Sequence, residues 1–224
     1  MNDNIHLKKY LKKRSIHKVG KPHKQIQRNN YKFFIVIPCY NEFEYIFDTL
    51  ESINIQNQNL LNDTLVVVII NHSIDDVIAI KENNSKTYSE LIKKKYIFDF
   101  IAIDCFSNQN ELPSQLAGVG YARKVGLDFC LNYALDDKSA FCSLDADTLI
   151  DKNYLNIIDY QFNDNNVNAA VINFKHQKSN NPIIEEGIRK YELLLKSIAQ
   201  KIADTGSPYG YVSMGSTIVC NRKS

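Results

Sequence analysis

Short apolar runs alternate with amphipathic segments along the chain, and this alternation predicts a mixed α/β fold. The first run, from Phe33 to Pro38, is continuously apolar and ends at a breaker, which is typical of a strand buried on both faces. Similar runs predict strands from Leu65 to Ile70 and from Ala140 to Leu144. Further strands are expected over residues 96–103, 167–174 and 211–220.

Apolar residues at helical spacing occupy the intervals between these runs. Helices are expected over residues 43–55, 86–95, 116–135, 152–162 and from Pro182 to about residue 202. Strands that alternate with helices form a mostly parallel central sheet covered on both faces, a three-layer αβα arrangement.

Ligands in such folds bind at the carboxyl ends of the strands. This rule draws attention to four segments that follow predicted strands: residues 38–42, residues 71–75, the loop after Asp104, and residues 145–148.

The chain has 224 residues and a net charge of +2, but its charges are unevenly distributed. Residues 1–32 hold ten Lys or Arg and a single acid, which leaves 17 basic and 24 acidic residues in the rest. We expect this basic arm to be a solvated leader, extended or partly disordered. Peripheral contact with an anionic membrane is the alternative. Aromatic residues are scarce in the arm, so nucleic acid is not an expected partner.

The five cysteines show no CxxC spacing, which argues against a zinc site or a disulfide framework. The start of the chain lacks the apolar core of a signal peptide, and its apolar runs are too short to cross a membrane. A cytoplasmic protein is therefore expected, with peripheral membrane contact through residues 1–32 as the alternative.

Asp145 and Asp147 directly follow a predicted buried strand, so their carboxylates can aim at one point where the chain turns. Carboxylates beside a phosphate suit Mg²⁺ or Mn²⁺. The alternatives are a helix cap and a solvated side chain. An aspartyl-phosphatase motif fits poorly, because Leu149 stands where that motif has Thr or Val.

Two other segments carry candidate ligand-binding side chains. Arg123 lies near two glycines at a helix start, where a cation can meet a phosphate or a base, although a surface arginine has the same pattern. Tyr40 follows the first strand and can stack on a nucleobase. The alternative for this segment is a turn in which Asn41 caps the next helix.

Four segments in this order resemble family 2 glycosyltransferases with the GT-A fold, over about residues 33 to 175. They are residues 35–42 (IVIPCYNE), 66–75 (VVVIINHSID), 120–126 (GYARKVG) and 144–148 (LDADT). The resemblance implies transfer of a sugar from a nucleotide-diphosphate donor to an acceptor hydroxyl, with Mn²⁺ or Mg²⁺ as cofactor and inversion at the sugar. The acceptor, whether glycan, lipid or small molecule, stays open.

The resemblance also implies roles for individual residues. Asp145 and Asp147 would bind the metal. The nucleotide would contact a second group of residues, namely Pro38, Tyr40, Asn41, Glu42, Asn71, Arg123 and Asp145. The family usually ends its second strand with a base-binding Asp, whereas Ile70 stands here. Asn71 is expected to substitute, since its amide both donates and accepts. His72 is a further side chain that could approach the nucleotide.

A second departure concerns the catalytic base, which the family usually carries downstream of its acceptor-side strand. Residues 215–220 resemble that strand, and the sequence ends at Ser224. The remaining candidates are weak and number four, namely Glu185, Glu186, Glu192 and Asp204. We therefore expect a basic arm over 1–32, a donor-binding region over 33–175, and over 176–224 the start of a truncated acceptor-side region.

Two alternatives to an active transferase follow. The chain could bind the donor without turning it over, as a catalytically incomplete module. A nucleotidyltransferase is less favoured, because the loop over residues 39–42 has neither the glycines nor the basic residues that such enzymes carry after the first strand.

Overall fold

A computed structural model describes residues 5–16 and 18–223, which contain one seven-stranded sheet in the order β1-β4-β3-β2-β5-β7-β6. The four central strands are parallel, whereas β1 and β7 run antiparallel to their inner neighbours and β6 runs antiparallel to β7. The strand bounds are β1 (Lys21–Pro22), β2 (Phe33–Cys39), β3 (Thr64–Asn71), β4 (Asp99–Cys105), β5 (Ala140–Ser143), β6 (Ala169–Val171) and β7 (Ile218–Asn221).

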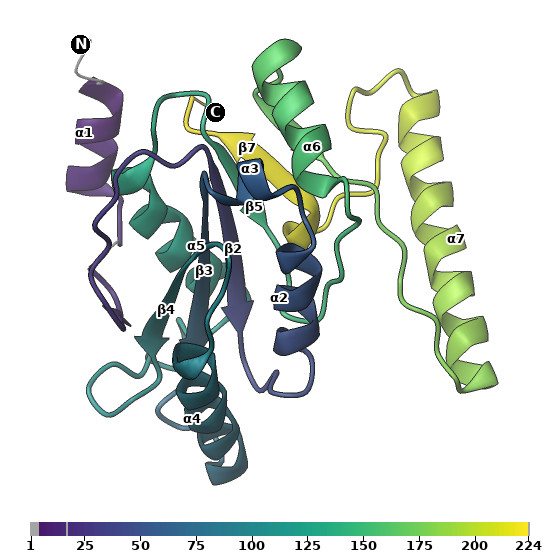
Figure 1. Ribbon diagram of the computed structural model, residues 1–224. Helices are drawn as coiled ribbons and strands as arrows, with labels where there is room; N and C mark the ends of the chain where they lie inside the picture. The colour runs from purple at the N-terminus through teal and green to yellow at the C-terminus, as the bar shows by residue number, and fades with distance from the viewer. Residues whose placement is uncertain (1–4, 17, 224) are drawn as a thin grey trace.

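Helices cover both faces of the sheet, so the molecule has three layers (Figure 1). One face carries α2 (Ile46–Asn54), α3 (Gln58–Leu61), α4 (Ile78–Lys93) and α6 (Tyr154–Asp159), and the other carries α5 (Val119–Cys130). The expected α/β fold with a mostly parallel central sheet is therefore confirmed.

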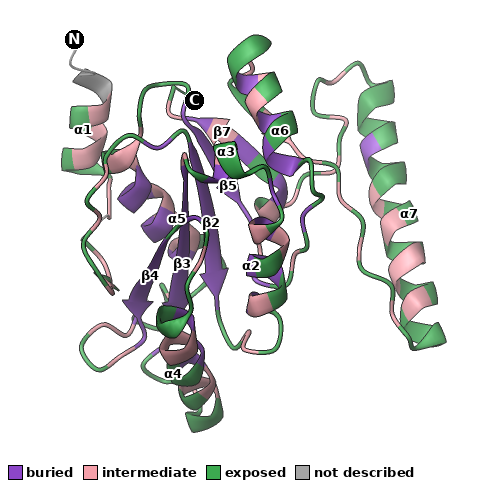
Figure 2. Ribbon diagram, in the orientation of Figure 1, coloured by how far each residue is buried: buried purple, intermediate pink, exposed green. Residues whose placement is uncertain are grey.

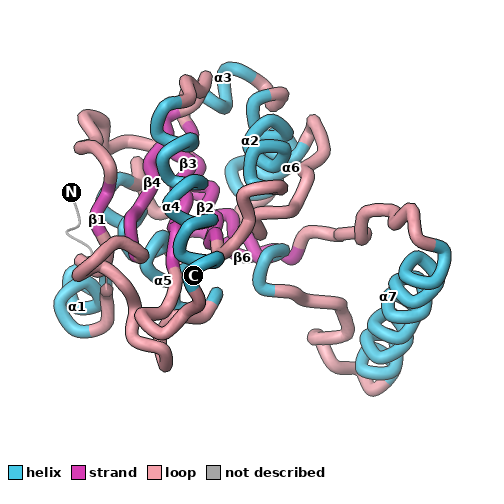
Figure 3. The backbone as a smooth tube through the Cα atoms, turned by 90° about the horizontal axis from the view of Figure 1, so that it is seen from below, coloured by secondary structure: helices cyan, strands magenta, loops and turns pink. Residues whose placement is uncertain are grey.

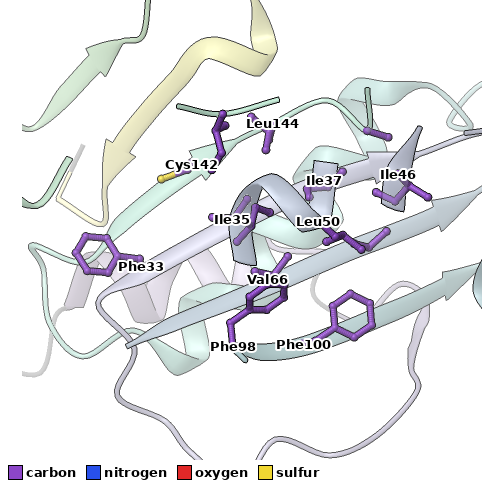
Figure 4. Close-up of a cluster of buried hydrophobic side chains, with 14 of the residues drawn as sticks. Phe33, Ile35, Ile37, Ile46, Leu50, Val66, Phe98, Phe100, Cys142 and Leu144 are labelled. Carbon is purple, nitrogen blue, oxygen red and sulfur yellow. The ribbon is translucent and has the colours of Figure 1, made fainter. Parts of the chain in front are cut away.

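Alternate residues of β2 supply the two halves of the core, because side chains along a strand point to opposite faces. Phe33, Ile35 and Ile37 pack with α2 on one face, as Figure 4 shows for a cluster that also contains Ile46 and Leu50. Phe34 and Val36 pack on the other face, against α5. Every residue of β2 and β3 is buried, which explains why continuous apolar runs marked these strands correctly (Figure 2).

The long helix α7 (Pro182–Asp204) lies beside this body rather than on the sheet (Figure 1 and Figure 3). The Asn181 side chain caps its start by accepting from the backbone N–H of Ile183, and Pro182 occupies the first turn. Ala199 is the one residue of α7 classed as buried. No helix within the described residues is long and apolar enough to cross a membrane.

The start of α4 differs from the prediction by eight residues, since it begins at Ile78 rather than at residue 86. Asn84 and Thr87 are buried in this helix beside Leu91, and the Asn84 side chain donates to the Asn71 carbonyl at 3.0 Å. Polar contacts therefore dock the first half of α4, and hydrophobic periodicity does not reveal such contacts.

Several other elements are shorter than expected. Helix α2 begins three residues late, after a turn, and β4 begins at Asp99. Helix α5 stops at Cys130 and continues as a single 3₁₀ turn, while β6 spans only three residues. The prediction of a strand over 211–220 is wrong before residue 218, because Thr217 accepts from and donates to the Met214 backbone and closes a 3₁₀ turn there.

The basic arm differs from the solvated leader expected over residues 1–32. Within its described part, α1 (Ile5–Lys13) packs beside α5, and β1 pairs with β4. The buried Asp128 of α5 holds the arm by accepting from the Tyr10 hydroxyl at 2.7 Å and the Ile16 N–H at 2.8 Å. Apolar residues interspersed among the lysines (Ile16, Val19 and Ile26) pack against the core, which explains the order. Residues 1–4 and 17 lie outside the described residues.

Candidate functional site

A cavity of about 970 Å³ opens at the carboxyl ends of β2, β3 and β5, where the sequence analysis predicts that a ligand binds. We call it the strand-end cavity. Seven of the eight residues proposed for nucleotide or metal line it: Pro38, Tyr40, Glu42, Asn71, Arg123, Asp145 and Asp147. Its volume lies within the range of about 300–1,000 Å³ found for small-molecule sites.

Asn41 is the proposed residue that is not part of this lining. Its backbone has φ 60°, and its N–H donates to the Asn84 side chain at 2.9 Å. The alternative of a helix cap is also wrong, because Tyr45 is the N-cap of α2. Asn41 instead turns the chain sharply after β2, in a left-handed conformation that Asn tolerates better than most residues.

Asn71 ends β3 with its side chain fixed and one oxygen unsatisfied. The residue is 1% exposed, and its amide nitrogen donates to the Ala117 carbonyl at 3.0 Å. Its Oδ1 has no hydrogen-bond partner among the described residues, and leaving such a buried oxygen unpaired costs about 1–3 kcal/mol. A ligand N–H in the cavity can remove this cost.

His72, the neighbour of Asn71, does not line the cavity. Its ring is buried, with Nδ1 at 3.2 Å from the Asn84 amide nitrogen and Phe106 packed edge-on against it. Burial lowers the pKa of His72 first, and the charge of Lys81 lowers it further. The histidine is therefore a neutral packing residue near pH 7.

Tyr40 stands at the rim of the strand-end cavity with 39% of its surface exposed. Its hydroxyl donates to Asp76 at 3.0 Å, and Asp76 in turn accepts from the Ser73 N–H at 2.7 Å. The loop after β3 therefore fixes the ring that β2 presents, and burial together with Asp76 raises the pKa of Tyr40. A positioned aromatic ring of this kind can stack on a planar ligand.

Arg123 links three walls of the cavity. It projects from α5 and donates from Nη2 to Asp145 at 2.7 Å. Its Nε is buried without a partner among the described residues. A Cβ placed on Gly215 would lie 2.6 Å from Arg123 Nη1, so the guanidinium packs directly on the glycine backbone. Loops from β5 and from before β7 therefore meet at this arginine.

Three carboxylates gather beside Arg123. Burial raises the pKa of Glu42, and the charges of Asp147 and Asp145 raise it further. The Thr49 hydroxyl of α2 donates to the Ala146 carbonyl at 2.7 Å and so fixes the backbone between the two aspartates. This negative region attracts a cation, whereas Arg123 already balances part of the charge of Asp145.

A divalent ion fits this region when a ligand supplies part of its coordination shell. Among residues 5–16 and 18–223, no three His, Cys, Asp or Glu side chains are placed to hold a metal by themselves. Mg²⁺ and similar ions are commonly held by one or two carboxylates together with phosphate oxygens of a substrate. Asp147, exposed in the cavity, with Asp145 beside it, fits that pattern when a diphosphate supplies the other oxygens.

The three glutamates of α7 lie in ion pairs and do not line the strand-end cavity. Glu185 accepts from Arg189 at 2.7 Å, and Glu186 pairs with Lys190 at 2.6 Å. Glu192 accepts from His176 and from Arg189, and these hydrogen bonds lower the pKa of Glu192 to about 2. A carboxylate with so low a pKa is a weak base.

Asp204, the fourth downstream acid, accepts from the Gln200 amide at 2.8 Å near the end of α7. It too is absent from the lining of the strand-end cavity. The structure thus brings the proposed donor-side residues together and keeps the proposed bases apart from them.

Other lining residues were not proposed from the sequence. Ser73, Asp75 and Asp76 follow β3, and the polar stretch after that strand was a usable signal for them. The segment 214–216 gave no such signal, because it reads as part of a strand. Only the 3₁₀ turn before β7 directs it to the cavity.

The fold is that of an α/β protein with a cavity at the carboxyl ends of parallel strands, where ligands bind in such folds. No protein-family model matches the chain, and no curated protein sequence matches it either. Among solved structures, it is similar to S. aureus TarS residues 1–349 in complex with UDP-GlcNAc, at 22% identity over 66% of this chain and 35% of that one, with a TM-score of 0.45.

A ligand-free structure of the same TarS fragment is 17% identical over 85% of this chain and 47% of that one, with a TM-score of 0.47. The mannosyltransferase PcManGT from Pyrobaculum calidifontis, in complex with GDP-Man and Mn²⁺, is 15% identical over 97% of this chain and 50% of that one, with a TM-score of 0.44. The chain therefore spans about a third to a half of the length of these structures.

Proposed function

We propose that this chain binds a nucleotide-diphosphate sugar in the strand-end cavity and is the donor-binding part of a metal-dependent, inverting glycosyltransferase of the family 2 type. The observation that carries the proposal is the polarity of the cavity. A fixed tyrosine and a buried, unsatisfied amide oxygen lie on the β3 side, where Asp75 and Asp76 are hydrogen-bonded within the protein. An arginine and three further carboxylates line the rest of the cavity. A base matches the β3 side, and a diphosphate with a cation matches the side of Arg123.

The hydrogen bonding of Asn71 narrows the choice of base. One N–H of its amide nitrogen donates to the Ala117 carbonyl, and its Oδ1 has no partner among the described residues, so Asn71 offers the base an acceptor. Uracil and guanine present a ring N–H on their pairing edge, whereas cytosine and adenine present a bare ring nitrogen there and can donate only from an exocyclic amine. A base that meets Asn71 through its ring nitrogen satisfies the oxygen only if that nitrogen carries a hydrogen. Uridine or guanosine diphosphate sugars are therefore the proposed donors.

The diphosphate is proposed to lie against Arg123, Asp145 and Asp147. Arg123 would donate to phosphate oxygens through the nitrogens that Asp145 does not use. Asp147, with Asp145, would hold Mn²⁺ or Mg²⁺, which neutralises the charge of the leaving diphosphate when bound. Gly215 allows Arg123 to occupy this place, since any side chain there would displace the guanidinium.

Calorimetric titration with the four nucleoside diphosphates of uridine, guanosine, cytidine and adenosine tests the proposal. UDP or GDP should bind, and Mn²⁺ should tighten that binding, whereas CDP and ADP should bind at least tenfold more weakly. Mn²⁺ alone should bind weakly, because the protein supplies only part of its coordination shell. Equal or absent binding of all four diphosphates with Mn²⁺ would overturn the proposal.

Asp147→Asn is the matched variant for the metal. It should remove most of the gain in UDP or GDP affinity that Mn²⁺ provides and leave the metal-free affinity nearly unchanged. Asp164→Asn is the control, because Asp164 is exposed and lies outside the cavity. A full Mn²⁺ effect in Asp147→Asn would assign the ion to other ligands.

A donor-binding module without turnover is the second candidate. It is favoured by the position of the α7 carboxylates, which lie in ion pairs outside the strand-end cavity. Incubation of the chain with UDP- and GDP-sugars and Mn²⁺, followed by measurement of released diphosphate, separates the two candidates. Release above the rate of Asp147→Asn supports an active transferase, whereas tight binding without release supports the module.

A further inference from the structure

A second cavity, of about 590 Å³, lies between α7 and the edge of the sheet. We call it the α7 cavity. Its lining is mainly apolar and comes from β6 and the residues after it, from α7, and from the segment before β7. The residues that matter here are Ala170, Ile172, Phe174, Leu195, Val212 and Ile218.

Both walls of the α7 cavity continue into the strand-end cavity. The wall formed by residues 172–174 runs on to Gln177, whose amide donates to the Asp147 carbonyl at 2.8 Å. The wall formed by residues 211–213 runs on to residues 214–216, where Gly215 packs against Arg123. The two cavities are therefore neighbours, and the α7 cavity adjoins the metal and diphosphate side rather than Asn71.

Glu192 lines the α7 cavity, but its carboxylate is already paired within the protein. It accepts from the His176 N–H at 2.9 Å and from Arg189 at 2.7 Å, so it does not require a cationic ligand. Asn173, Lys196 and Ser213 also line this cavity, and its remaining walls are aliphatic or aromatic. Water gains little against those apolar walls, so an apolar group can displace it there favourably.

We infer that the α7 cavity binds an aliphatic chain, and that the acceptor of the proposed transfer is an amphiphile with its chain in this cavity and its hydroxyl toward Asp147. The role as acceptor rests on the proposed function, whereas binding of the chain does not. An alkyl chain fits better than a second sugar, because eight of the thirteen lining residues have no hydrogen-bonding side chain.

Alkyl glucosides of increasing length test the inference without any nucleotide. Hexyl, heptyl and octyl β-D-glucoside, each below its micelle concentration, are titrated into the full chain by calorimetry. Burial of each added methylene should tighten binding by about fourfold. Free glucose should show no binding, and affinity independent of chain length would overturn the inference.

Neighbouring leucines of α7 provide a matched pair of variants. Leu195 lines the cavity, whereas Leu194 is 56% exposed and does not. Leu195→Gln should abolish the dependence on chain length, and Leu194→Gln should preserve it. The reverse result would place the detergent on exposed apolar residues of α7, such as Leu193, Leu194 and Ile198, and contradict the inference. Circular dichroism shows whether each variant is folded, and Ile218→Gln provides a second cavity variant if Leu195→Gln is not.

A competition experiment separates this inference from the proposed function. Octyl glucoside should bind equally well with and without saturating UDP or GDP and Mn²⁺, because the cavities are distinct. Displacement of the nucleotide by octyl glucoside would place the chain in the strand-end cavity and refute the inference. Failure of both nucleotides to bind, with octyl glucoside still bound according to chain length, would refute only the proposed function and the acceptor role.

Discussion

At the scale of single residues, Asn71 and Arg123 each use some of their hydrogen-bonding groups within the protein and leave another without a partner among the described residues: Asn71 Oδ1 and Arg123 Nε. Such buried atoms are uncommon because they cost stability. Asn54 Oδ1 and His72 Nε2 also have no partner but lie outside the strand-end cavity, so the binding role proposed for Asn71 and Arg123 rests on their place in its lining as well. The consequences can be measured one side chain at a time.

Replacing Asn71 with Leu should weaken UDP or GDP binding by tenfold or more, since the variant keeps the branched shape and loses the acceptor, together with the amide that donates to Ala117. A hydrogen bond to a buried, otherwise unsatisfied group contributes about 1–3 kcal/mol. Calorimetry measures the affinity, and Asn59→Leu, on the exposed surface of α3, is the control. Unchanged nucleotide affinity in Asn71→Leu would remove Asn71 from the proposed base contact.

Glycine substitutions test the packing of Arg123. Gly215→Ala should weaken diphosphate binding by about tenfold, because the new methyl displaces the guanidinium and hydrogen bonds to charged groups contribute about 1.5–3 kcal/mol. Gly187→Ala, in α7, is the matched control, because a Cβ there meets nothing within 4 Å. That control should bind normally and raise the free energy of unfolding by about 0.5–1 kcal/mol. Equal affinities of the two variants would contradict this role of Gly215.

Asp104 gives a pH-dependent contribution to stability. Burial alone would raise its pKa, but hydrogen bonds from Ser107, the Phe106 N–H and Asn110 outweigh burial and lower the pKa. A lowered folded-state pKa means that the carboxylate stabilises the protein above the unfolded-state value, near 4, and that this stabilisation is lost as the pH falls through the folded pKa.

Asp104→Asn should therefore lower the free energy of unfolding by about 1–3 kcal/mol near pH 7. The difference from the unsubstituted chain should shrink as the pH falls below about 4. Urea unfolding at pH 7, 5 and 3 measures it, with the exposed Asp164→Asn as control. A constant difference across that range would mean that ionisation of Asp104 is not responsible.

At the scale of secondary-structure elements, α5 connects the N-terminal arm to the strand-end cavity. Consecutive residues of this helix face different partners, since Arg123 reaches Asp145 while Lys124 donates to Asp128 at 2.7 Å. Asp128 is 2% exposed and also holds Tyr10 and Ile16 of the arm. The described part of the arm is therefore integrated into the fold.

Removal of the Asp128 carboxylate should detach the arm. Asp128→Ala should lower the free energy of unfolding by about 2–3 kcal/mol, because two donors of the arm lose a buried, charged partner. Urea unfolding measures the loss, and proteolysis after the lysines of the arm should become faster. Asp164→Ala is the control, and an unchanged cleavage rate in Asp128→Ala would show that other contacts hold the arm.

At the scale of the whole molecule, the ligand site depends on elements that are far apart in the sequence. The strand-end cavity draws on β2, β3, α5, the loop after β5 and the turn before β7. A ligand that contacts all of them binds the folded chain and not the unfolded one, so it stabilises the whole fold.

A nucleotide at one hundred times its dissociation constant, with Mn²⁺, should raise the free energy of unfolding by about 2.7 kcal/mol. For a chain of this size, that corresponds to a rise of roughly 5–11 °C in the melting temperature. Scanning calorimetry suits the measurement, since the chain has no tryptophan. Asp147→Asn with the same additions should shift less, and an equal shift in both would argue against a metal-linked site.

The sequence by itself determined the central strands β2, β3 and β5, because they are buried on both faces and each appears as a continuous apolar run. It also directed attention to the ends of these strands as the place for a ligand, since the ends of parallel strands meet at one edge of a sheet. Only the tertiary structure decided how polar groups are paired. The docking of α4 through Asn84, the folding of the arm onto Asp128 and the position of Gly215 against Arg123 all depend on contacts between residues distant in sequence. Hydrophobic periodicity records which positions are buried, but not how buried polar atoms are paired.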